Sequence, residues 1–341
     1  MLGKYGGDAL RLYLMGSPVM KGEDILISEE QYRNQVRGLL LILWNVYNFF
    51  VANANADKWI SKVKNQPFGF AQGKKSKIES QNILDQWILS RLYGNVKNVT
   101  KALERFDTVD AIGHAGILFI HDLSNWYVRR IRDRVGPSAP NDQDKKDAYQ
   151  TLWLVLNEYC KVLAPIIPFV TEEIYRNLTG EESVHLASWP TLNKSLYNAK
   201  LETDMDNGMS LASVIHAFRK AATLKVRIPL RTLAYKGPQQ LSDEARKVVE
   251  DEVNVYKLIY QGKSKEYTVT GDTNEKNQDL AAGEAREIVR RIQSERKKLG
   301  VALNQYITVT LLSWPKEHEQ WIKKQALIKD LRVGKIFTVS A

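Results

Sequence analysis

The segment from Trp126 to Arg134 carries residue types that bind nucleic acids. Trp126 and Tyr127 are followed by four arginines and a single aspartate. A guanidinium group pairs bidentately with phosphate and stacks on bases, and aromatic rings are platforms for unpaired bases. The same residues also fit salt bridges to neighbouring helices and favourable charges at a helix C-terminus. Both interpretations stay open for the candidate residues Trp126, Arg129, Arg130, Arg132 and Arg134.

A second basic cluster lies between residues 286 and 298, where only Glu287 and Glu295 oppose the cations. Its candidates for phosphate contact are Arg290, Arg291, Lys297 and Lys298, and the alternative is a solvated helix face. The whole chain has 49 Lys+Arg against 39 Asp+Glu, a net charge of +10. Such a balance favours a polyanionic partner, although a positive charge also serves solubility.

The sequence predicts neither a catalytic residue nor a metal or cofactor site. It contains no G-x-x-x-x-G-K-[ST] and no G-x-G-x-x-G, the loops that hold phosphates with backbone N–H groups. The five histidines offer no H-x-x-x-H pair for a metal. Cys160 is the single cysteine and lies in an apolar helical run, which indicates a small buried hydrophobic residue.

Helical spacing of apolar residues dominates the first 190 positions. Ser28 and Gln31 form a capping box for the first long helix, and a polar stretch with Gly and Pro predicts a surface loop over 64–80. Asp142 is the expected N-cap of a later helix. The predicted helices cover about 29–55, 83–103, 111–127, 142–162 and 171–180. Short connections predict that they pack as an antiparallel helical bundle.

Beyond residue 190 the pattern changes to a mixture of helix and strand. A linker over 191–203 is followed by predicted helices at 205–224 and 281–299, and alternation predicts strands at 226–230, 306–312 and 336–339. No internal repeat is visible. The expected fold class is therefore mainly α, a helical bundle followed by a small α+β C-terminal domain.

Export and membrane insertion are not expected. The chain has no run of eighteen uncharged apolar residues, and its amino terminus lacks a basic region followed by an apolar run and a cleavage site. These features predict a cytoplasmic protein without a membrane partner.

Several strings together resemble isoleucyl-tRNA synthetase, a class I enzyme, in its archaeal and eukaryotic cytosolic branch. They include Lys4–Arg11 (KYGGDALR), Leu43–Phe50 (LWNVYNFF) and Leu163–Tyr175 (LAPIIPFVTEEIY). Valyl- and leucyl-tRNA synthetases share the Ala-Pro-x-x-Pro-Phe turn. The string Asn125–Arg130 (NWYVRR) is the one that is similar to the isoleucine enzyme in particular.

The resemblance implies three regions: a remnant of the catalytic-half and stem-contact region at 1–27, a helical anticodon-binding bundle at 28–190, and a linker with an α+β domain at 191–341. It implies that the chain binds tRNA for isoleucine and positions it for aminoacylation. The family's two ATP-binding signatures, His-x-Gly-His and Lys-Met-Ser-Lys-Ser, are absent, and Lys74–Lys77 (KKSK) is only a superficial echo. The chain alone is therefore expected to be inactive, with ATP and Mg²⁺ used by the full-length enzyme.

Other interpretations remain for a chain of this kind. It is a freestanding tRNA-binding protein if the catalytic half is separately encoded and acts in trans. It belongs to a valyl- or leucyl-type synthetase if the isoleucine-type string misleads. It is a helical interaction module if its positive charge is incidental, and tRNA binding would then be absent or insensitive to salt.

Overall fold

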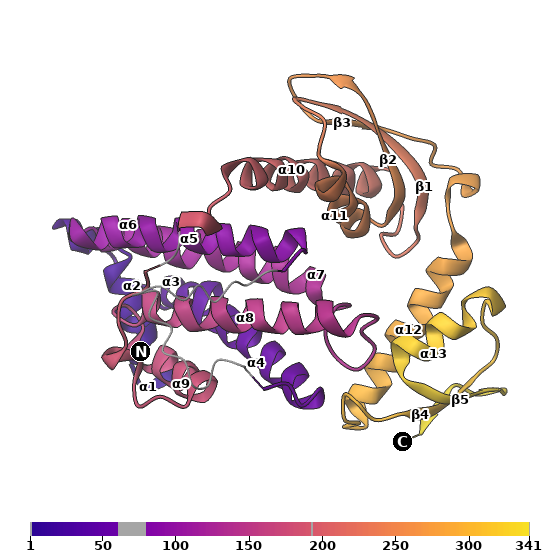
Figure 1. Cartoon of the computed structure of the whole chain (residues 1–341), viewed down its shortest axis with the longest axis horizontal. Helices are drawn as coiled ribbons and strands as arrows, with labels where there is room; N and C mark the ends of the chain where they lie inside the picture. Colours follow the sequence, from indigo (N-terminus) through magenta and orange to yellow (C-terminus); the bar gives the residue numbers. More distant parts are fainter. Residues whose placement is uncertain (1, 61–79, 192–193, 341) are drawn as a thin grey trace. The chain divides into compact units, whose positions relative to one another are not determined.

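The structure is a computed structural model that describes residues 2–60, 80–191 and 194–340, leaving aside the side chains of Gln35, Ile117 and Leu118. The chain divides into two compact units, Met1–Ala199 and Lys200–Ala341, which Figure 1 shows in sequence colours. The predicted loop over 64–80 lies outside the described residues except for Ser80, and so does the whole of Lys74–Lys77.

The described part of the first unit is helical. Two long stretches, from Glu29 to Ala56 and from Thr108 to Ile131, contain π-helical segments between their α-helical parts. The elements are α1 (Leu2–Tyr5), α2 (Gly7–Met15), η1 (Pro18–Lys21), α3 (Glu29–Gln35), η2 (Val36–Leu40), α4 (Leu41–Ala56), α5 (Ile83–Glu104), α6 (Thr108–Ile112), η3 (Gly113–Phe119), η4 (Asp122–Val128), α7 (Arg129–Ile131), α8 (Asp142–Leu163), α9 (Pro168–Thr179), η5 (Val184–Leu186) and η6 (Lys194–Leu196). The predicted helices are confirmed.

Side-chain caps explain where several of these helices begin. The Ser28 hydroxyl accepts a hydrogen bond from the Gln31 backbone N–H at 3.2 Å, as the capping box predicts. The expected cap at Asp142 is wrong by one residue. The Asn141 side-chain oxygen accepts from the N–H groups of Gln143 and Asp144 at 2.9 and 3.0 Å. Asp142 instead occupies the first turn, where its charge complements the helix dipole.

Helix α8 lies at the centre of the first unit and contacts α4, α5 and α9; Figure 1 shows it beside α5. Trp87 of α5 and Leu156, Tyr159 and Cys160 of α8 have no exposed surface. The interpretation of Cys160 as a buried hydrophobic residue is confirmed, and burial raises the pKa of its thiol. Apolar burial on this scale is the main stabilising contribution to a helical unit.

Helix α2 packs against the start of α9 and the turn before it, within the first unit. Asp8 of α2 accepts hydrogen bonds from the backbone N–H groups of Phe169 and Val170 at 3.1 and 2.7 Å, and so caps α9. The Arg11 guanidinium donates to the carbonyl oxygens of Pro165 and Ile166 at 2.7 and 3.0 Å. Helix α9 begins at Pro168, three residues before the predicted start, because proline is favoured at the first helical position.

One helical stretch, Glu29–Ala56, is long and apolar enough to cross a membrane by length and composition. The sequence test for eighteen uncharged residues did not identify it, because a few charges are tolerated in such a window. A third of that window, 33%, is buried inside the structure. One such helix is weak evidence, since the core helix of a soluble protein has the same length and composition.

The second unit combines helices with small mixed sheets, as expected for an α+β domain. Its elements are α10 (Ala199–Ala221), β1 (Leu230–Gly237), α11 (Asp243–Val253), β2 (Val255–Lys263), β3 (Thr268–Thr270), η7 (Glu275–Asn277), α12 (Leu280–Lys298), β4 (Ile307–Leu311), η8 (Lys316–His318), α13 (Glu319–Ala326), β5 (Ile328–Val333) and β6 (Thr338–Ser340). The strand expected at 226–230 starts only at Leu230. Helices α11 and α13 and strands β2, β3 and β5 were not predicted.

The second unit contains a structural repeat that is not visible in the sequence. The described strands of the second unit form two three-stranded sheets, ordered β2-β1-β3 and β5-β4-β6. The central strand β1 pairs in parallel with β2 and antiparallel with β3. In the same way, β4 pairs in parallel with β5 and antiparallel with β6. A long helix precedes each central strand and a shorter helix follows it. We call residues 199–271 copy 1 and residues 280–341 copy 2.

A buried arginine near the end of the long helix repeats in both copies. In copy 1 the Arg219 guanidinium donates to the carbonyl oxygens of Lys225 at 3.3 Å, Ile228 at 3.2 Å and Asn254 at 2.7 Å. In copy 2 Arg296 donates to the corresponding carbonyl oxygens of Ala302 at 2.8 Å and Gln305 at 2.9 Å. Its third acceptor, the carbonyl oxygen of Ala326 at 3.2 Å, lies one position before the counterpart of Asn254. Each arginine thus fastens the turn between the long helix and the central strand. Sequence similarity between the copies is too weak to reveal this correspondence.

The two copies differ at the left-handed residue that ends the long helix. Thr223 has φ 56° in copy 1, and Gly300 has φ 65° at the matching place in copy 2. A side chain with Cβ is strained in this region, whereas glycine is not. We expect Thr223→Gly to raise the free energy of unfolding by about 0.5–1 kcal/mol after the entropy of the unfolded glycine is subtracted, and Gly300→Thr to lower it by a similar amount.

Thermal and urea denaturation of both variants measure this difference. No atom lies within 4 Å of a Cβ built on Gly300, so steric crowding does not complicate the reverse change. Shifts of the same sign in the two variants would contradict the assignment of these residues to one backbone position.

Candidate nucleic-acid interface

The first basic cluster lies on η4 and α7 and in the turn that follows. Trp126 is only 9% exposed. The Arg130 guanidinium covers its ring, with the guanidinium carbon 3.5 Å from the ring centre. Arg130 also donates to the carbonyl oxygen of Trp126 at 2.9 Å. Trp126 is therefore a core residue closed by a cation–π contact, and neither of these two side chains presents a free face to a base.

Arg129 and Arg132 are the exposed cations of this cluster. The guanidinium carbon of Arg132 lies 6.0 Å from the ring centre of Phe49 on α4, at the margin of a cation–π contact. Long exposed arginines near a helix C-terminus interact favourably with the helix dipole, and a guanidinium group can bind phosphate bidentately. Among the predicted residues of the first unit, these two have the accessibility that a phosphate contact requires.

Arg134 belongs to a buried ion cluster, which corrects its prediction as a tRNA contact. Its guanidinium donates to both oxygens of Asp85 at 2.8 and 2.7 Å and to both oxygens of Asp144 at 2.8 Å. Its side chain is 10% exposed and that of Asp85 is fully buried. Burial disfavours the charge of Arg134, but the hydrogen bonds to Asp85 and Asp144 outweigh burial and raise its pKa. Arg134 therefore forms salt bridges to neighbouring helices, which is the second of the two interpretations that the sequence left open.

Two further side chains complete the ion cluster around Asp85. The Tyr127 hydroxyl donates to Asp85 Oδ1 at 2.7 Å, and the Ser80 hydroxyl donates to Asp85 Oδ2 at 2.6 Å. Burial raises the pKa of Tyr127 well above its ordinary value. The carboxylate of Asp85 thus joins α5 to the helix end that carries the exposed arginines and holds that end in place.

The second basic cluster lies on α12, in the other unit. Arg290 pairs with Glu287, the Nε–Oε2 distance being 3.1 Å, and Lys298 pairs with Glu295 at 2.7 Å. The Arg291 guanidinium carbon is 4.6 Å from the ring centre of Phe337. These three side chains and Lys297 are exposed. The cluster is a charged helix face whose cations are partly neutralised, which keeps both predicted alternatives open.

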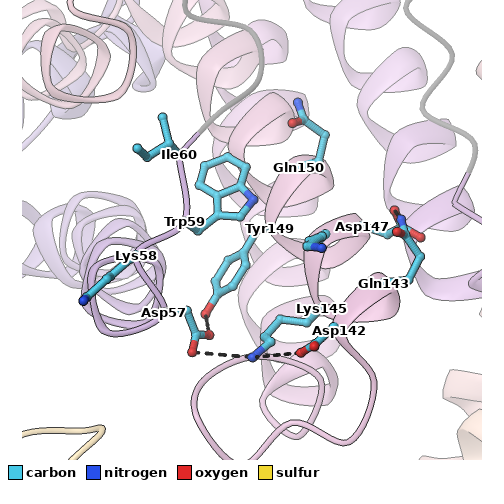
Figure 2. A pocket seen from close by; sticks show the side chains of 11 residues that line it. Asp57, Lys58, Trp59, Ile60, Asp142, Gln143, Lys145, Asp147, Tyr149 and Gln150 are labelled. Carbon is cyan, nitrogen blue, oxygen red and sulfur yellow. Dashed lines mark hydrogen bonds and ion pairs between the residues drawn. The ribbon is translucent and has the colours of Figure 1, made fainter.

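A pocket that the sequence did not reveal lies where α4 ends and α8 begins (Figure 2). It has a volume of about 450 Å³. Its walls are formed by Asp57, Lys58, Trp59 and Ile60 after α4, and by Asp142, Gln143, Lys145, Lys146, Asp147, Tyr149 and Gln150 of α8. The two segments are about ninety positions apart in the chain. In the sequence, Trp59 stands between the helix predicted at 29–55 and the loop predicted at 64–80. This position does not indicate that Trp59 lies against the start of α8.

Hydrogen bonds fix the floor of this pocket. The Tyr149 hydroxyl donates to Asp57 Oδ2 at 2.6 Å, and the Gly136 N–H donates to the same oxygen at 3.1 Å. Lys145 Nζ lies 3.5 Å from Asp57 Oδ1 and 3.6 Å from Asp142 Oδ1, as the dashed lines of Figure 2 show. Burial and the hydrogen bond to Asp57 raise the pKa of Tyr149. Asp57 therefore has a structural role and is not free to bind a ligand.

Residues 85–234 match the family model for the anticodon-binding domain of tRNA ligase. An isoleucine–tRNA ligase from Treponema denticola is 37% identical over 276 residues, 77% of this chain and 24% of the relative. One from Dehalococcoides mccartyi is 36% identical over 363 residues, 98% of this chain and 34% of the relative. The chain is therefore similar to a part of isoleucine–tRNA ligases that includes the anticodon-binding domain. A further isoleucine–tRNA ligase, from Treponema pallidum, is 34% identical over 274 residues, 78% of this chain and 25% of the relative.

The chain spans about a quarter to a third of the length of the isoleucine–tRNA ligases it matches. The solved LeuRS chain of a LeuRS-tRNA-LeuAMS ternary complex from Agrobacterium radiobacter K84 is 19% identical, with a TM-score of 0.41. That match covers 58% of this chain and 21% of the other, and a TM-score below 0.5 does not establish a common fold.

Proposed function

We propose that this chain binds the anticodon region of tRNA and positions the tRNA for aminoacylation with isoleucine. The observation that carries the proposal is the exposed pair Arg129 and Arg132, which lies within the residues that match the anticodon-binding domain. Binding energy gained at the anticodon would orient the distant acceptor end and discriminate among tRNAs. Arg130, Arg134 and Trp126 support this helix end from inside and leave the set of proposed contacts.

The proposal assigns the chemical step to a catalytic half that works with this chain. ATP and Mg²⁺ act there. The sequence lacks both ATP-binding signatures, and among the described residues no three His, Cys, Asp or Glu side chains gather as they would around a metal ion. An antiparallel class I bundle, the archaeal and eukaryotic branch and a cytoplasmic location are further parts of the proposal.

Exposed arginines that contact phosphates should make tRNA binding steeply dependent on salt. We expect Arg129→Ala with Arg132→Ala to weaken binding and to reduce the slope of log affinity against log salt by about 0.7–0.9 for each phosphate-binding arginine that is removed. Filter binding of an isoleucine tRNA between low and moderate salt measures the slope. A valine tRNA measured in parallel tests the specificity for isoleucine.

The matched control is Arg105→Ala. Arg105 is 62% exposed and pairs with Asp110. Asp110 lies near the start of the helical stretch that carries Arg129, roughly 30 Å from Arg129 at 1.5 Å per residue. Removal of Arg105 should leave the slope unchanged. A flat salt dependence of the unaltered chain would favour the helical interaction module, and an equal effect of Arg105→Ala would move the interface away from Arg129 and Arg132.

A further inference from the structure

We propose that the pocket between the ends of α4 and α8 receives one unpaired base of the bound tRNA, stacked on the indole ring of Trp59. The inference rests on the proposed function and assigns a base-binding position to it. Single-stranded RNA is recognised by aromatic platforms beside cations, and such stacking tolerates any base. Trp59 is the partly exposed aromatic side chain of this pocket.

The chain geometry holds Trp59 in a fixed position. Helix α4 ends in a Schellman-type turn, in which Lys58 is left-handed with φ 54° and the Trp59 N–H donates to the Ala54 carbonyl oxygen at 2.8 Å. The ring centre of Trp59 lies 5.6 Å from that of Phe50 and 5.6 Å from that of Tyr149. A platform fixed in this way loses little conformational entropy when a base stacks on it.

The remaining walls suit a base and its flanking phosphates. Gln150 of α8 offers an amide that can both donate to and accept from a base edge, and Figure 2 shows it among the residues that line the pocket. Lys58 and Lys146 are exposed at the same pocket. A volume of about 450 Å³ is within the range of small-molecule sites.

The neighbouring elements identify RNA as the occupant. The turn that follows Arg132 and Arg134 leads directly to Gly136, whose N–H is bound to the pocket residue Asp57 at 3.1 Å. Gly136 has φ 84°, and a Cβ there would lie 2.9 Å from Asn53 Oδ1, so this close approach requires glycine. Arg132 also lies over Phe49 of the helix that ends at the pocket. A tRNA loop whose phosphates contact Arg129 and Arg132 therefore has its unpaired bases within reach of Trp59.

The test is a cycle between Trp59→Leu and abasic positions in the tRNA loop. Leucine keeps an apolar contact with Phe50 and Tyr149 but removes the aromatic face. We expect Trp59→Leu to weaken tRNA binding by about 5- to 100-fold, and Trp59→Phe to recover most of the affinity. One abasic position should weaken binding to the unaltered chain by a similar factor and have no further effect on Trp59→Leu.

The control is Trp44→Leu on α4, the helix that precedes Trp59. Trp44 is 38% exposed and stacks on Tyr47 with a centre distance of 5.4 Å, roughly 20 Å from Trp59 along the helix. Its change should leave affinity unaltered, and melting curves of all variants report on folding. An affinity decrease from Trp59→Leu that is equal for intact and every abasic tRNA would overturn the proposal.

The remaining outcomes separate this inference from the proposed function. If the chain binds tRNA through Arg129 and Arg132 but no abasic position depends on Trp59, the base pocket is overturned and the function stands. If the unaltered chain binds no tRNA, both are overturned. Saturable binding of free AMP, GMP, CMP or UMP that Trp59→Leu abolishes, without any effect of this change on tRNA affinity, would assign the pocket to a mononucleotide and overturn the RNA occupant.

Discussion

Replacing Asp85 by alanine is expected to lower the stability of the unit Met1–Ala199 by about 3–5 kcal/mol, the usual cost of removing one partner of a buried ion pair. Asp85 is fully buried, and its two oxygens accept hydrogen bonds from Arg134, Tyr127 and Ser80. Alanine would leave the guanidinium of Arg134 with Asp144 as its remaining carboxylate, 29% exposed. The destabilisation is therefore far larger than that from breaking a surface ion pair.

Hydrogen exchange of peptides from α5 and α8 measures the effect, because it reports opening free energies within one unit of a larger chain. The control is Asp110→Ala, which removes the exposed pair with Arg105 and should cost less than about 1 kcal/mol. Similar small effects for both aspartates would show that the cluster around Asp85 does not hold the helices together. In that case the Asp85→Ala variant should also bind tRNA with unchanged affinity, because Arg129 would keep its position.

The second large effect is expected for Arg296→Met, which should destabilise copy 2 by about 2–5 kcal/mol because several buried carbonyl oxygens are left without their donors. Arg296 is 4% exposed and donates to the carbonyl oxygens of Ala302, Leu303, Gln305 and Ala326. Burial lowers its pKa, since no described carboxylate offsets the charge there. Methionine keeps the apolar stem and removes every donor.

Hydrogen exchange of β4 and β5 is the measurement, with β1 and β2 of copy 1 as the internal reference. Arg290→Met on the same helix is the control, because Arg290 is 69% exposed in its pair with Glu287. Arg219→Met should produce the mirror result, with destabilisation confined to copy 1. Faster exchange spread evenly over both copies would contradict two separately fastened turns.

The sequence was sufficient to predict the long helices. Apolar residues at helical spacing give a signal that is local, and the caps at Ser28 and Gly180 are equally local. The basic clusters show where such reasoning ends. Arg132 and Arg134 are two residues apart, yet one is exposed and the other is bound to Asp85, 49 positions away. No spacing rule distinguishes them.

The strands of the second unit were harder to predict for a related physical reason. β2 and β5 each bury few of their side chains, so alternation is weak and polar residues dominate. The repeat was not visible because it is preserved in topology and in Arg219 and Arg296, while most other positions differ. The pocket beside Trp59 could not be found either, because it is assembled from segments that meet only in three dimensions.

The two copies have the same topology but differ in charge. Copy 1 contains 12 lysines and arginines against 9 aspartates and glutamates, a net of +3. Copy 2 contains 12 against 6, a net of +6, in a shorter segment. More than half of the chain's net charge of +10 is therefore concentrated on the last 62 residues. Since long-range attraction follows net charge, copy 2 would dominate the approach of any polyanion at low ionic strength, before a specific contact forms.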